Sequence, residues 1–388
     1  MKNYRIIAKT LEKHFDSFKQ TLVLLGARQV GKTTLLKRLF PDALYLQADE
    51  KPVADLLEKF SSENYKKIIK NHQQIVIDEI HLISNPGRAV KLIYDQFPDL
   101  QIIITGSSSL HIKNKTAESM AGRAITYHLY PLTYTEYLHQ LGVEKFESSS
   151  VILNKISSLD NSQTIKLYNL QDLLDGVLKY GLYPELLNQQ EKIEYLENLS
   201  QRAIFKDIVE LNLIENRAKA LDLLKVLAYQ IGNIISYAEI SRKIGLTIPT
   251  IQRYIDIFED SYIIFRLSPF SKNKRDEIGK SPKIYFWDLG IRNALINNFE
   301  DINIRSDAGA LFENFIIAEL KKENDYSKSR YALNYWRTKS GSEVDLVLFN
   351  HKEIIGVELK YNKGKMTTAF KNRYPEAKTV VINSENFY

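Results

Sequence analysis

A glycine-rich stretch near the amino end has the residue types and spacing that bind phosphate. Residues Gly26 to Thr33 follow the pattern G-x-x-x-x-G-K-T, after the apolar run Leu22–Leu25 and before a helical pattern. In that context the loop turns its backbone N–H groups toward phosphate oxygens, and the helix N-terminus adds partial positive charge. Lys32 should then reach the β- and γ-phosphates, and the Thr33 hydroxyl should ligate Mg²⁺. The predicted nucleotide-binding residues of this loop are Gly26, Ala27, Arg28, Gln29, Val30, Gly31, Lys32, Thr33 and Thr34.

Two acidic residues end the next apolar run, Gln74–Ile77. This run predicts a buried parallel strand that carries Asp78 and Glu79 at its carboxyl end. There Asp78 would hold Mg²⁺ through water and bind the nucleotide complex, and Glu79 would polarise the attacking water as general base. The loop and the two acids together predict binding and hydrolysis of ATP with Mg²⁺.

A third apolar run, Gln101–Thr105, leads into the serine-rich stretch Gly106–Ser109. Ligands of open α/β sheets bind at the carboxyl ends of the strands, so Ser107 is a candidate for contact with the nucleotide. A plain serine-rich turn explains the same residues equally well. Arg123 is a candidate arginine finger, acting within its own chain or across a subunit boundary, or an ordinary surface arginine.

A second set of acids lies near the carboxyl end of the chain. Asp345 and Glu358 belong to two strand patterns that would form a hairpin, which puts Asp345 opposite Glu358 and Lys360 on the face of Glu358. Glu313 lies on the apolar face of a helix predicted over 306–321, or at its edge with the carboxylate in water. Carboxylate oxygens suit Mg²⁺ or Mn²⁺, with Asp345 and Glu358 as ligands, and Lys360 could position or deprotonate a water. Glu313, Asp345, Glu358 and Lys360 are therefore candidate catalytic residues.

The elements that would carry these residues fall into four predicted domains. Residues 1–130 form a parallel α/β nucleotide-binding core, and 131–216 form a helical lid with a polar insertion or loop near 144–165. Residues 217–298 combine a helix-turn-helix with a strand pair, which predicts a winged helix. Residues 299–388 form the α/β domain that carries the second acidic set. The fold class is α/β.

The predicted helix-turn-helix has features for and against contact with DNA. Thr250, Gln252 and Arg253 lie on the second helix, and the linker of the strand pair is rich in lysine and arginine. Against this, Asp256 and the pair Glu259–Asp260 would repel phosphate. A plain protein-contact role stays open.

The overall composition sets only broad limits. The chain has 388 residues, and 53 Lys and Arg against 47 Asp and Glu give a net charge of +6, which permits a polyanionic partner without requiring one. The absence of cysteine excludes disulfides and thiolate metal sites and fits a cytoplasmic location. No apolar run is long enough for a membrane span, so no membrane partner is expected.

The motifs at Gly26–Thr34, Ile77–Ile80, Thr105–Ser109, Ala121–Arg123 and Pro131–Tyr137 resemble those of prokaryotic AAA-type ATPases that carry a C-terminal domain of unknown function. These proteins are related to archaeal ATPases and to signal-transducing STAND NTPases. The resemblance implies a nucleotide-driven machine or switch with a tendency to self-associate. It also likens Gly181–Pro184 to a glycine–proline motif of a lid that approaches the nucleotide.

The spacing E…D-x12-E-x-K of the second acidic set resembles the PD-(D/E)xK nuclease-like superfamily, although valine rather than proline precedes Asp345. This resemblance implies a restriction-endonuclease-like fold. Two functions follow: an ATPase whose cycle controls a nuclease-like, DNA-acting domain, or an ATP-dependent switch whose C-terminal half only binds a protein or nucleic acid. A third, a nuclease regulator in which ATP is structural, is disfavoured by the intact Asp78 and Glu79.

Overall fold

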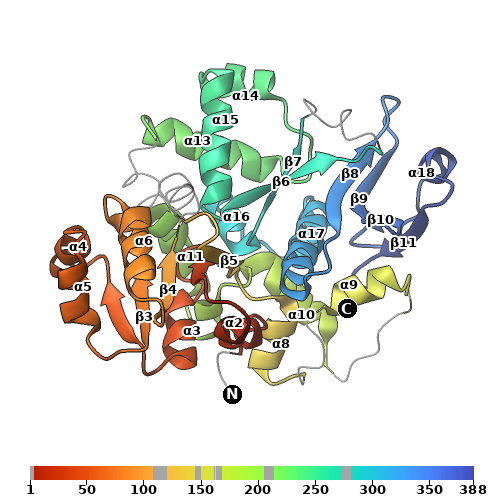
Figure 1. Cartoon of the computed structure of the whole chain (residues 1–388). Helices are drawn as coiled ribbons and strands as arrows, with labels where there is room; N and C mark the ends of the chain where they lie inside the picture. The colour runs from red at the N-terminus through yellow and green to blue at the C-terminus, as the bar shows by residue number, and fades with distance from the viewer. Residues whose placement is uncertain are drawn as a thin grey trace. The chain divides into compact units, whose positions relative to one another are not determined.

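The computed structural model describes residues 4–107, 120–144, 150–160, 162, 168–204, 214–272 and 281–388. The chain divides into two compact units. The first contains Met1–Pro131 and Asp260–Tyr262, and the second contains Leu132–Glu259 and Ile263–Tyr388. Figure 1 shows the elements of both units. Among the described residues, no helix is long and apolar enough to cross a membrane.

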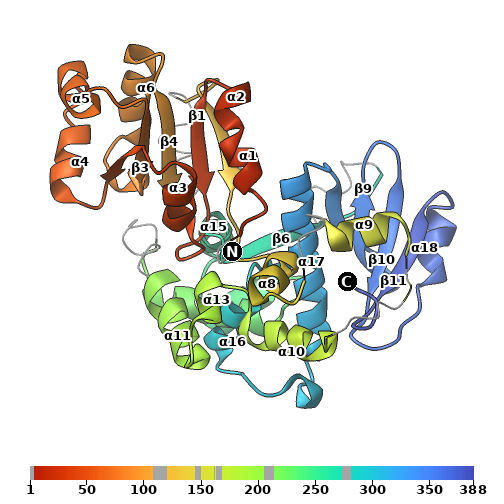
Figure 2. The same cartoon turned by 90° about the horizontal axis from the view of Figure 1, so that it is seen from below.

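The first unit is built on a five-stranded sheet in the order β2-β3-β4-β1-β5, in which every pair is parallel. Its strands are β1 (Thr21–Leu25), β2 (Leu44–Gln47), β3 (Gln74–Asp78), β4 (Gln101–Gly106) and β5 (Ala124–His128). The helices are α1 (Ala8–Glu12), α2 (His14–Ser17), α3 (Lys32–Leu39), α4 (Lys51–Leu57), α5 (Ser62–Ile69), η1 (Ile80–Leu82) and α6 (Pro86–Gln96). In Figure 2, α4 and α5 lie beyond β3 on one side, and α1 and α2 lie beyond β1 on the other.

The central strands β1, β3 and β4 are buried except for the first residues of β3 and β4, Gln74 and Gln101, as their apolar sequence predicts. Because all five strands run the same way, the residues that follow β1, β3 and β4 meet at one edge. Leu25 pairs with Gly106, and Ile77 pairs with Ile104, so the phosphate-binding loop, Asp78 and Ser107 share that edge. The sequence prediction of a parallel α/β core with these strands is confirmed.

The second unit contains a six-stranded sheet in the order β11-β10-β9-β8-β6-β7. Its strands are β6 (Ile264–Pro269), β7 (Lys283–Phe286), β8 (Ala332–Arg337), β9 (Glu343–Phe349), β10 (Ile354–Leu359) and β11 (Lys378–Ile382). Helices that precede β8 are α8 (Tyr134–Leu141), α9 (Val151–Ser157), α10 (Leu170–Tyr180), η2 (Pro184–Leu187), α11 (Lys192–Asn198), η3 (Leu199–Ile204), α13 (Arg217–Tyr229), α14 (Tyr237–Ile244), α15 (Ile248–Asp260), α16 (Leu289–Ile296), η5 (Ile302–Ile304) and α17 (Ala308–Ser327), and α18 (Thr368–Arg373) follows β10.

Helices α13, α14 and α15 and the antiparallel pair β6–β7 occur where the sequence predicts helix-turn-helix and strand pair. Ser236 accepts a hydrogen bond from Glu239 N, and Gly245 ends α14 at φ 66°. The strand pair is not a separate wing, however, because β6 also pairs in parallel with β8. The domain boundary predicted at residue 298 therefore separates strands that belong to one continuous sheet: β6 and β7 lie before it and β8 to β11 after it. The basic linker lies mostly at 273–280, outside the described residues.

The polar stretch 144–165, expected to be a loop, contains helix α9. Ile152, Leu153 and Ile156 are buried on it. The carboxylate of Glu323, from α17, accepts hydrogen bonds from the N–H groups of Ile152 (3.3 Å) and Leu153 (2.7 Å) and so caps the helix. The short apolar pattern of α9 was hard to recognise among the surrounding serines. The residue that caps the helix, Glu323, lies far along the chain, so no local pattern predicts it. Residues 145–149, 161 and 163–167 of that stretch lie outside the described residues.

Candidate nucleotide site and acidic site

The phosphate-binding loop begins directly after β1 and ends at the first turn of α3. Gly26 has no room for a side chain, because a Cβ there would lie 2.1 Å from the carbonyl oxygen of Leu129. Gln29 (φ 61°) and Gly31 (φ 92°) adopt left-handed conformations, which turn successive N–H groups toward one concave face. The side chains of Arg28, Gln29 and Thr34 are not buried. The local geometry is that of an anion-binding loop.

Lys32 is buried and folded back on its own loop. Its Nζ donates to the carbonyl oxygens of Gly26 (2.8 Å) and Ala27 (3.0 Å), and it lies 3.9 Å from Glu79 Oε1. A buried ammonium requires acceptors, and the loop carbonyls supply them in this structure. Phosphate oxygens are stronger acceptors for a cation, so Lys32 can exchange these carbonyls for a nucleotide.

Asp78 joins the loop to the neighbouring strand. Its Oδ2 accepts a hydrogen bond from Thr33 Oγ1 at 2.6 Å, and its Oδ1 accepts one from Thr105 Oγ1. Thr105 also accepts a hydrogen bond from Glu79 N at 3.0 Å. Thr33 and Asp78 thus lie together as predicted. Thr105, which orients Asp78 and Glu79, was not among the predicted site residues. Its position at the end of the apolar run Gln101–Thr105, next to the same sheet edge, was the available signal in the sequence.

The oxygen atoms of Thr33 and Asp78 match the preference of Mg²⁺. The hydroxyl and carboxylate already lie in hydrogen-bond contact, Asp78 is buried, and both are hard oxygen donors beside the loop that would hold phosphate. The residues present therefore fit a magnesium ion shared with a bound nucleotide.

Glu79 follows β3 in a left-handed conformation, with φ 52° and ψ 40°. This conformation is costly for a residue with a side chain and is found preferentially at functional sites. Its carboxylate lies between Lys32 and His81: Oε2 is 3.2 Å from His81 Nδ1. The second ring nitrogen of His81, Nε2, is hydrogen-bonded to Ser107 Oγ at 3.4 Å. His81 was not predicted as a site residue, although it stands only two positions after Glu79.

Arg123 lies at the opposite edge of the sheet. It immediately precedes β5, its carbonyl oxygen accepts a hydrogen bond from Thr21 N (2.8 Å) at the start of β1, and its Nε donates to Asp95 (3.0 Å). The five residues of β1 separate this edge from the phosphate-binding loop, which corresponds to roughly 16 Å. The structure therefore does not bring Arg123 to the phosphate-binding loop of its own chain, and the finger role, within the chain or across a subunit boundary, stays a prediction.

Arg5 is a second residue that the sequence reading missed. Its buried guanidinium donates to the carbonyl oxygen of Val30 in the phosphate-binding loop (2.7 Å) and to that of Tyr130 after β5 (2.5 Å). Hydrogen bonds from a charged donor are about twice as strong as neutral ones. Arg5 thus fixes the loop to the sheet from a segment that offered no motif.

In the second unit, strands β9 and β10 pair in the predicted antiparallel register. Val357 pairs with Leu346, so the next positions, Glu358 and Asp345, face each other. Lys360 Nζ lies 3.0 Å from Asp345 Oδ2 and 2.8 Å from Glu358 Oε1. The Leu359 N–H also donates to Asp345 Oδ2 at 2.8 Å. Asp345, Glu358 and Lys360 converge as the sequence predicts.

Glu313 departs from the prediction. It is partly buried, with a side chain 15% exposed, and it accepts hydrogen bonds from Lys283 Nζ (3.1 Å) and Tyr285 OH (2.5 Å), while Lys283 also pairs with Glu343 (2.5 Å). Lys283 begins β7, the strand that was assigned to a separate wing, and it supplies the positive charge that pairs with Glu313. Within the described ranges no group of three or more acidic or histidine side chains could hold a metal ion.

The pKa values of Glu358, Lys360 and Glu313 differ from those of the free side chains. Burial, and next the charge of Asp345, raise the pKa of Glu358. Burial lowers the pKa of Lys360, but Asp345 and Glu358 outweigh it, and the pKa ends above its usual value. Lys360 is therefore charged near neutral pH in this structure, which suits it to position a group, and its role in deprotonating water stays a prediction. Burial raises the pKa of Glu313, against the opposing effect of Lys283.

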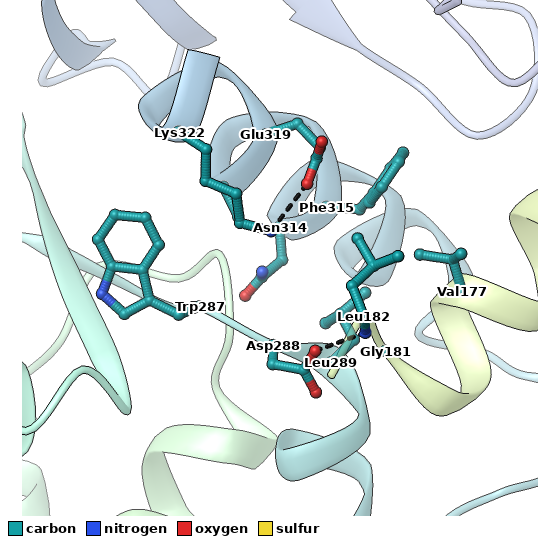
Figure 3. A pocket seen from close by; sticks show the side chains of 11 residues that line it. Val177, Gly181, Leu182, Trp287, Asp288, Leu289, Asn314, Phe315, Glu319 and Lys322 are labelled. Carbon is teal, nitrogen blue, oxygen red and sulfur yellow. Dashed lines mark hydrogen bonds and ion pairs between the residues drawn. The ribbon is translucent and has the colours of Figure 1, made fainter. Parts of the chain in front are cut away.

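The glycine–proline motif Gly181–Pro184 lies inside the second unit, against the N-terminus of α16. Gly181 has φ 76°, and a Cβ there would lie 2.2 Å from Asp288 Oδ1. Asp288 accepts hydrogen bonds from Leu182 N (2.6 Å) and Ile291 N (3.1 Å). Figure 3 shows Gly181, Leu182 and Asp288 beside a cavity of about 10 Å³, enough for one water, which the buried pair Glu319–Lys322 also lines. Gly181 thus has a structural role, and its contact with nucleotide stays a prediction.

Comparison with known proteins agrees with the site in the first unit. Residues 18–138 match the family model described as AAA domain. This match and the loop geometry define the region as an ATPase-like AAA domain of the P-loop class. Residues 171–302 match a domain of unknown function (DUF8612), and residues 308–388 match another (DUF4143), so neither match names a function for the second unit.

Several relatives span most of the chain. An uncharacterized protein of Methanocaldococcus jannaschii is 28% identical over 409 residues, which covers 99% of this chain and 85% of the relative. An uncharacterized protein of Mycobacterium tuberculosis is 24% identical over 350 residues, covering 87% of this chain and 70% of the relative. Among solved structures, the Walker-type ATPase of Pyrococcus abyssi matches with a TM-score of 0.49 at 14% identity, covering 76% of this chain and 96% of that one.

Proposed function

We propose that this protein binds ATP with Mg²⁺ and hydrolyses it, with Glu79 as general base, and that the nucleotide cycle drives a molecular switch. The observation that carries the proposal is the meeting of Lys32, Thr33, Asp78 and Glu79 at one sheet edge, linked by the Thr33–Asp78 hydrogen bond of 2.6 Å. A chance glycine turn would not bring the two acids of another strand to the same place.

Each residue has a separate task in this proposal. The loop N–H groups and Lys32 bind the phosphates and hold the γ-phosphate in line. Thr33 and Asp78 hold Mg²⁺, which when bound offsets the phosphate charge. Glu79 accepts the proton of the attacking water, and its left-handed backbone directs the carboxylate to the loop.

Magnesium-dependent release of phosphate from ATP, measured with and without duplex, single-stranded and branched DNA, tests the proposal. We expect turnover that requires Mg²⁺ and that is absent in Lys32→Ala. Stimulation by one form of DNA would make DNA the partner, whereas turnover indifferent to all forms would favour a protein partner. Absence of turnover and of ATP binding in the unaltered protein would refute the proposal.

A second candidate function is metal-dependent cleavage of phosphodiesters, in a nuclease-like domain that the nucleotide cycle controls. One observation favours it: Glu358 Oε2 is buried and has no hydrogen-bond partner among the described residues, although it faces Asp345 and Lys360. A buried carboxylate oxygen with no donor is costly, and a cation would satisfy it. Asp345 and Glu358 are the residues that would hold Mg²⁺ or Mn²⁺, which supplies a positive charge to a phosphodiester.

The pairing of Glu313 with Lys283 supports the other possibility, a C-terminal half that binds a partner without cutting it. Cleavage of labelled DNA with Mg²⁺ or Mn²⁺ separates the two. Cleavage that is lost in Asp345→Ala while ATP turnover persists would establish the nuclease. No cleavage by the unaltered protein, with binding retained, would establish the switch.

The helix-turn-helix segment supports DNA as the partner only in part. Arg242 and Lys243 are exposed at the end of α14, and Gln252 is exposed on α15. The predicted contact residue Arg253 pairs with Glu215 at 2.9 Å, which reduces its availability for phosphate. On the same helix, Asp256 and Glu259 are both paired with Arg266, which offsets the repulsion that the sequence predicted.

A further inference from the structure

His81 occupies a place between two predicted parts of the ATPase site. It lies in η1, directly after Glu79, and its imidazole is buried. One ring nitrogen, Nδ1, lies 3.2 Å from Glu79 Oε2, and the other, Nε2, is hydrogen-bonded to Ser107 Oγ at 3.4 Å. Ser107 follows β4, at the sheet edge where the phosphates would bind. A single side chain thus contacts both the carboxylate and the end of the neighbouring strand.

The contacts of Lys32 indicate what changes when a nucleotide binds. Lys32 lies 3.9 Å from Glu79 Oε1 and donates to two loop carbonyls. When Lys32 moves its hydrogen bonds to phosphate oxygens, Glu79 keeps His81 beside its second carboxylate oxygen. The orientation of the base then depends on His81, and through it on Ser107.

We propose that His81 is a positioning residue that holds Glu79 in the orientation for water attack and links that orientation to Ser107. The proposal rests on the role of Glu79 as general base. His81 Nδ1 lies 3.2 Å from Glu79 Oε2, although these two atoms are not in hydrogen-bond geometry, and in the tautomer that carries the proton on Nδ1 the Nε2 atom accepts from the Ser107 hydroxyl. His81 contributes no proton transfer to the reaction itself, so its loss reduces turnover without removing ATP binding.

A buried histidine can also be purely structural, and His14 in the same unit is an example. It is buried, its Nδ1 is hydrogen-bonded to Tyr127 OH (2.9 Å), and its Nε2 contacts the carbonyl oxygen of Gln20 (2.8 Å). None of these partners belongs to the nucleotide site. His14 is therefore a matched control for the effect of removing a buried imidazole from this unit.

The test compares kcat, KM and ATP affinity for the full chain and its variants. In His81→Ala we expect kcat to fall roughly 10- to 100-fold, as small misplacements of a reacting group do, with ATP affinity within about twofold. His81→Asn keeps an amide donor near the position of Nδ1 and should recover part of kcat. His14→Asn should lower thermal stability and leave kcat unchanged. Ser107→Ala should lower kcat, and its effect should not add to that of His81→Ala, because both act through one contact chain.

The outcomes distinguish this inference from the proposal on which it rests. If Glu79→Gln abolishes turnover while His81→Ala and His81→Asn both keep kcat, His81 is structural and the inference is wrong. If Glu79→Gln itself keeps full turnover, Glu79 is not the general base, and the proposed function is wrong before the role of His81 is tested. If His81→Ala does not fold, His81→Asn decides: a lower kcat at unchanged stability and ATP affinity supports positioning, and an unchanged kcat overturns it.

Discussion

Lys283 should be among the residues on which the second unit most depends. Its side chain is only 2% exposed, and its ammonium bridges Glu313 at 3.1 Å and Glu343 at 2.5 Å. Lys283→Met preserves the length of the side chain and removes the charge, which leaves the partly buried Glu313 without its cation. Breaking a buried pair from one side typically costs about 3–5 kcal/mol. For a unit of this size we therefore expect the melting temperature to fall by roughly 10 °C.

The loss of stability in Lys283→Met should be larger at high pH than at low pH. Burial raises the pKa of Glu313 and Lys283 opposes the rise, so without Lys283 the pKa of Glu313 goes higher still. An acid whose pKa is raised in the folded state destabilises that state as pH rises above its unfolded value, near 4.5. The penalty of Lys283→Met should thus be largest near pH 8 and shrink toward pH 5, where Glu313 takes up a proton.

Thermal unfolding of the second unit, followed by circular dichroism at pH 5 and pH 8, measures both effects. Lys378→Met is the matched control, because Lys378 pairs with Glu353 at 2.9 Å on the surface of the same sheet and is 50% exposed. Such a pair contributes only about 0–1 kcal/mol. The double variant Lys283→Met, Glu313→Gln should recover part of the loss. Equal stability of the two lysine variants at pH 8, or no recovery in the double variant, would refute the reasoning.

Three further predictions concern other parts of the chain. Lys32→Ala should abolish tight ATP binding, measured by titration calorimetry, because the phosphates lose their buried cation, and normal affinity would contradict the phosphate-binding loop. Gly181→Ala should lower the melting temperature by several degrees, since the new Cβ meets Asp288 at a positive φ, whereas Gly176→Ala in α10, with open space around it, should be neutral or stabilising. Arg5→Met should lower both the stability of the first unit and ATP affinity, because the loop loses its hydrogen bond at Val30, and unchanged affinity would limit Arg5 to a structural role.

The predictions from sequence succeed where the determining residues are close together in the chain. The phosphate-binding loop needs only β1, the six residues Gly26–Gly31 and the first turn of α3, so Lys32 and Thr33 could be placed without any tertiary contact. Asp78 follows from an apolar strand that ends in acids. The hairpin of β9 and β10 has a short connection, and alternation along its strands places Asp345 opposite Glu358.

The failures arise from contacts between distant segments. Lys283 precedes Glu313 by 30 residues and lies in a strand of another predicted domain, so the pair could not be read from local patterns. The pairing of β6 with β8 merges the two predicted domains, and no periodicity reveals which strands pair. Arg123 could be placed only once the register of β5 with β1 was known. His81 is different: its position next to Glu79 was visible, but its burial and its contact with Ser107 were not.

In the proposed mechanism Glu79 activates water beside a nucleotide held by the phosphate-binding loop. The most direct test is Mg²⁺-dependent ATP turnover by Glu79→Gln, with ATP affinity measured on the same protein. Glutamine keeps the shape of the side chain and removes its basicity, so we predict unchanged affinity and a loss of turnover of at least about 100-fold. Turnover equal to that of the unaltered protein would contradict the account, because the base would then have to be another residue.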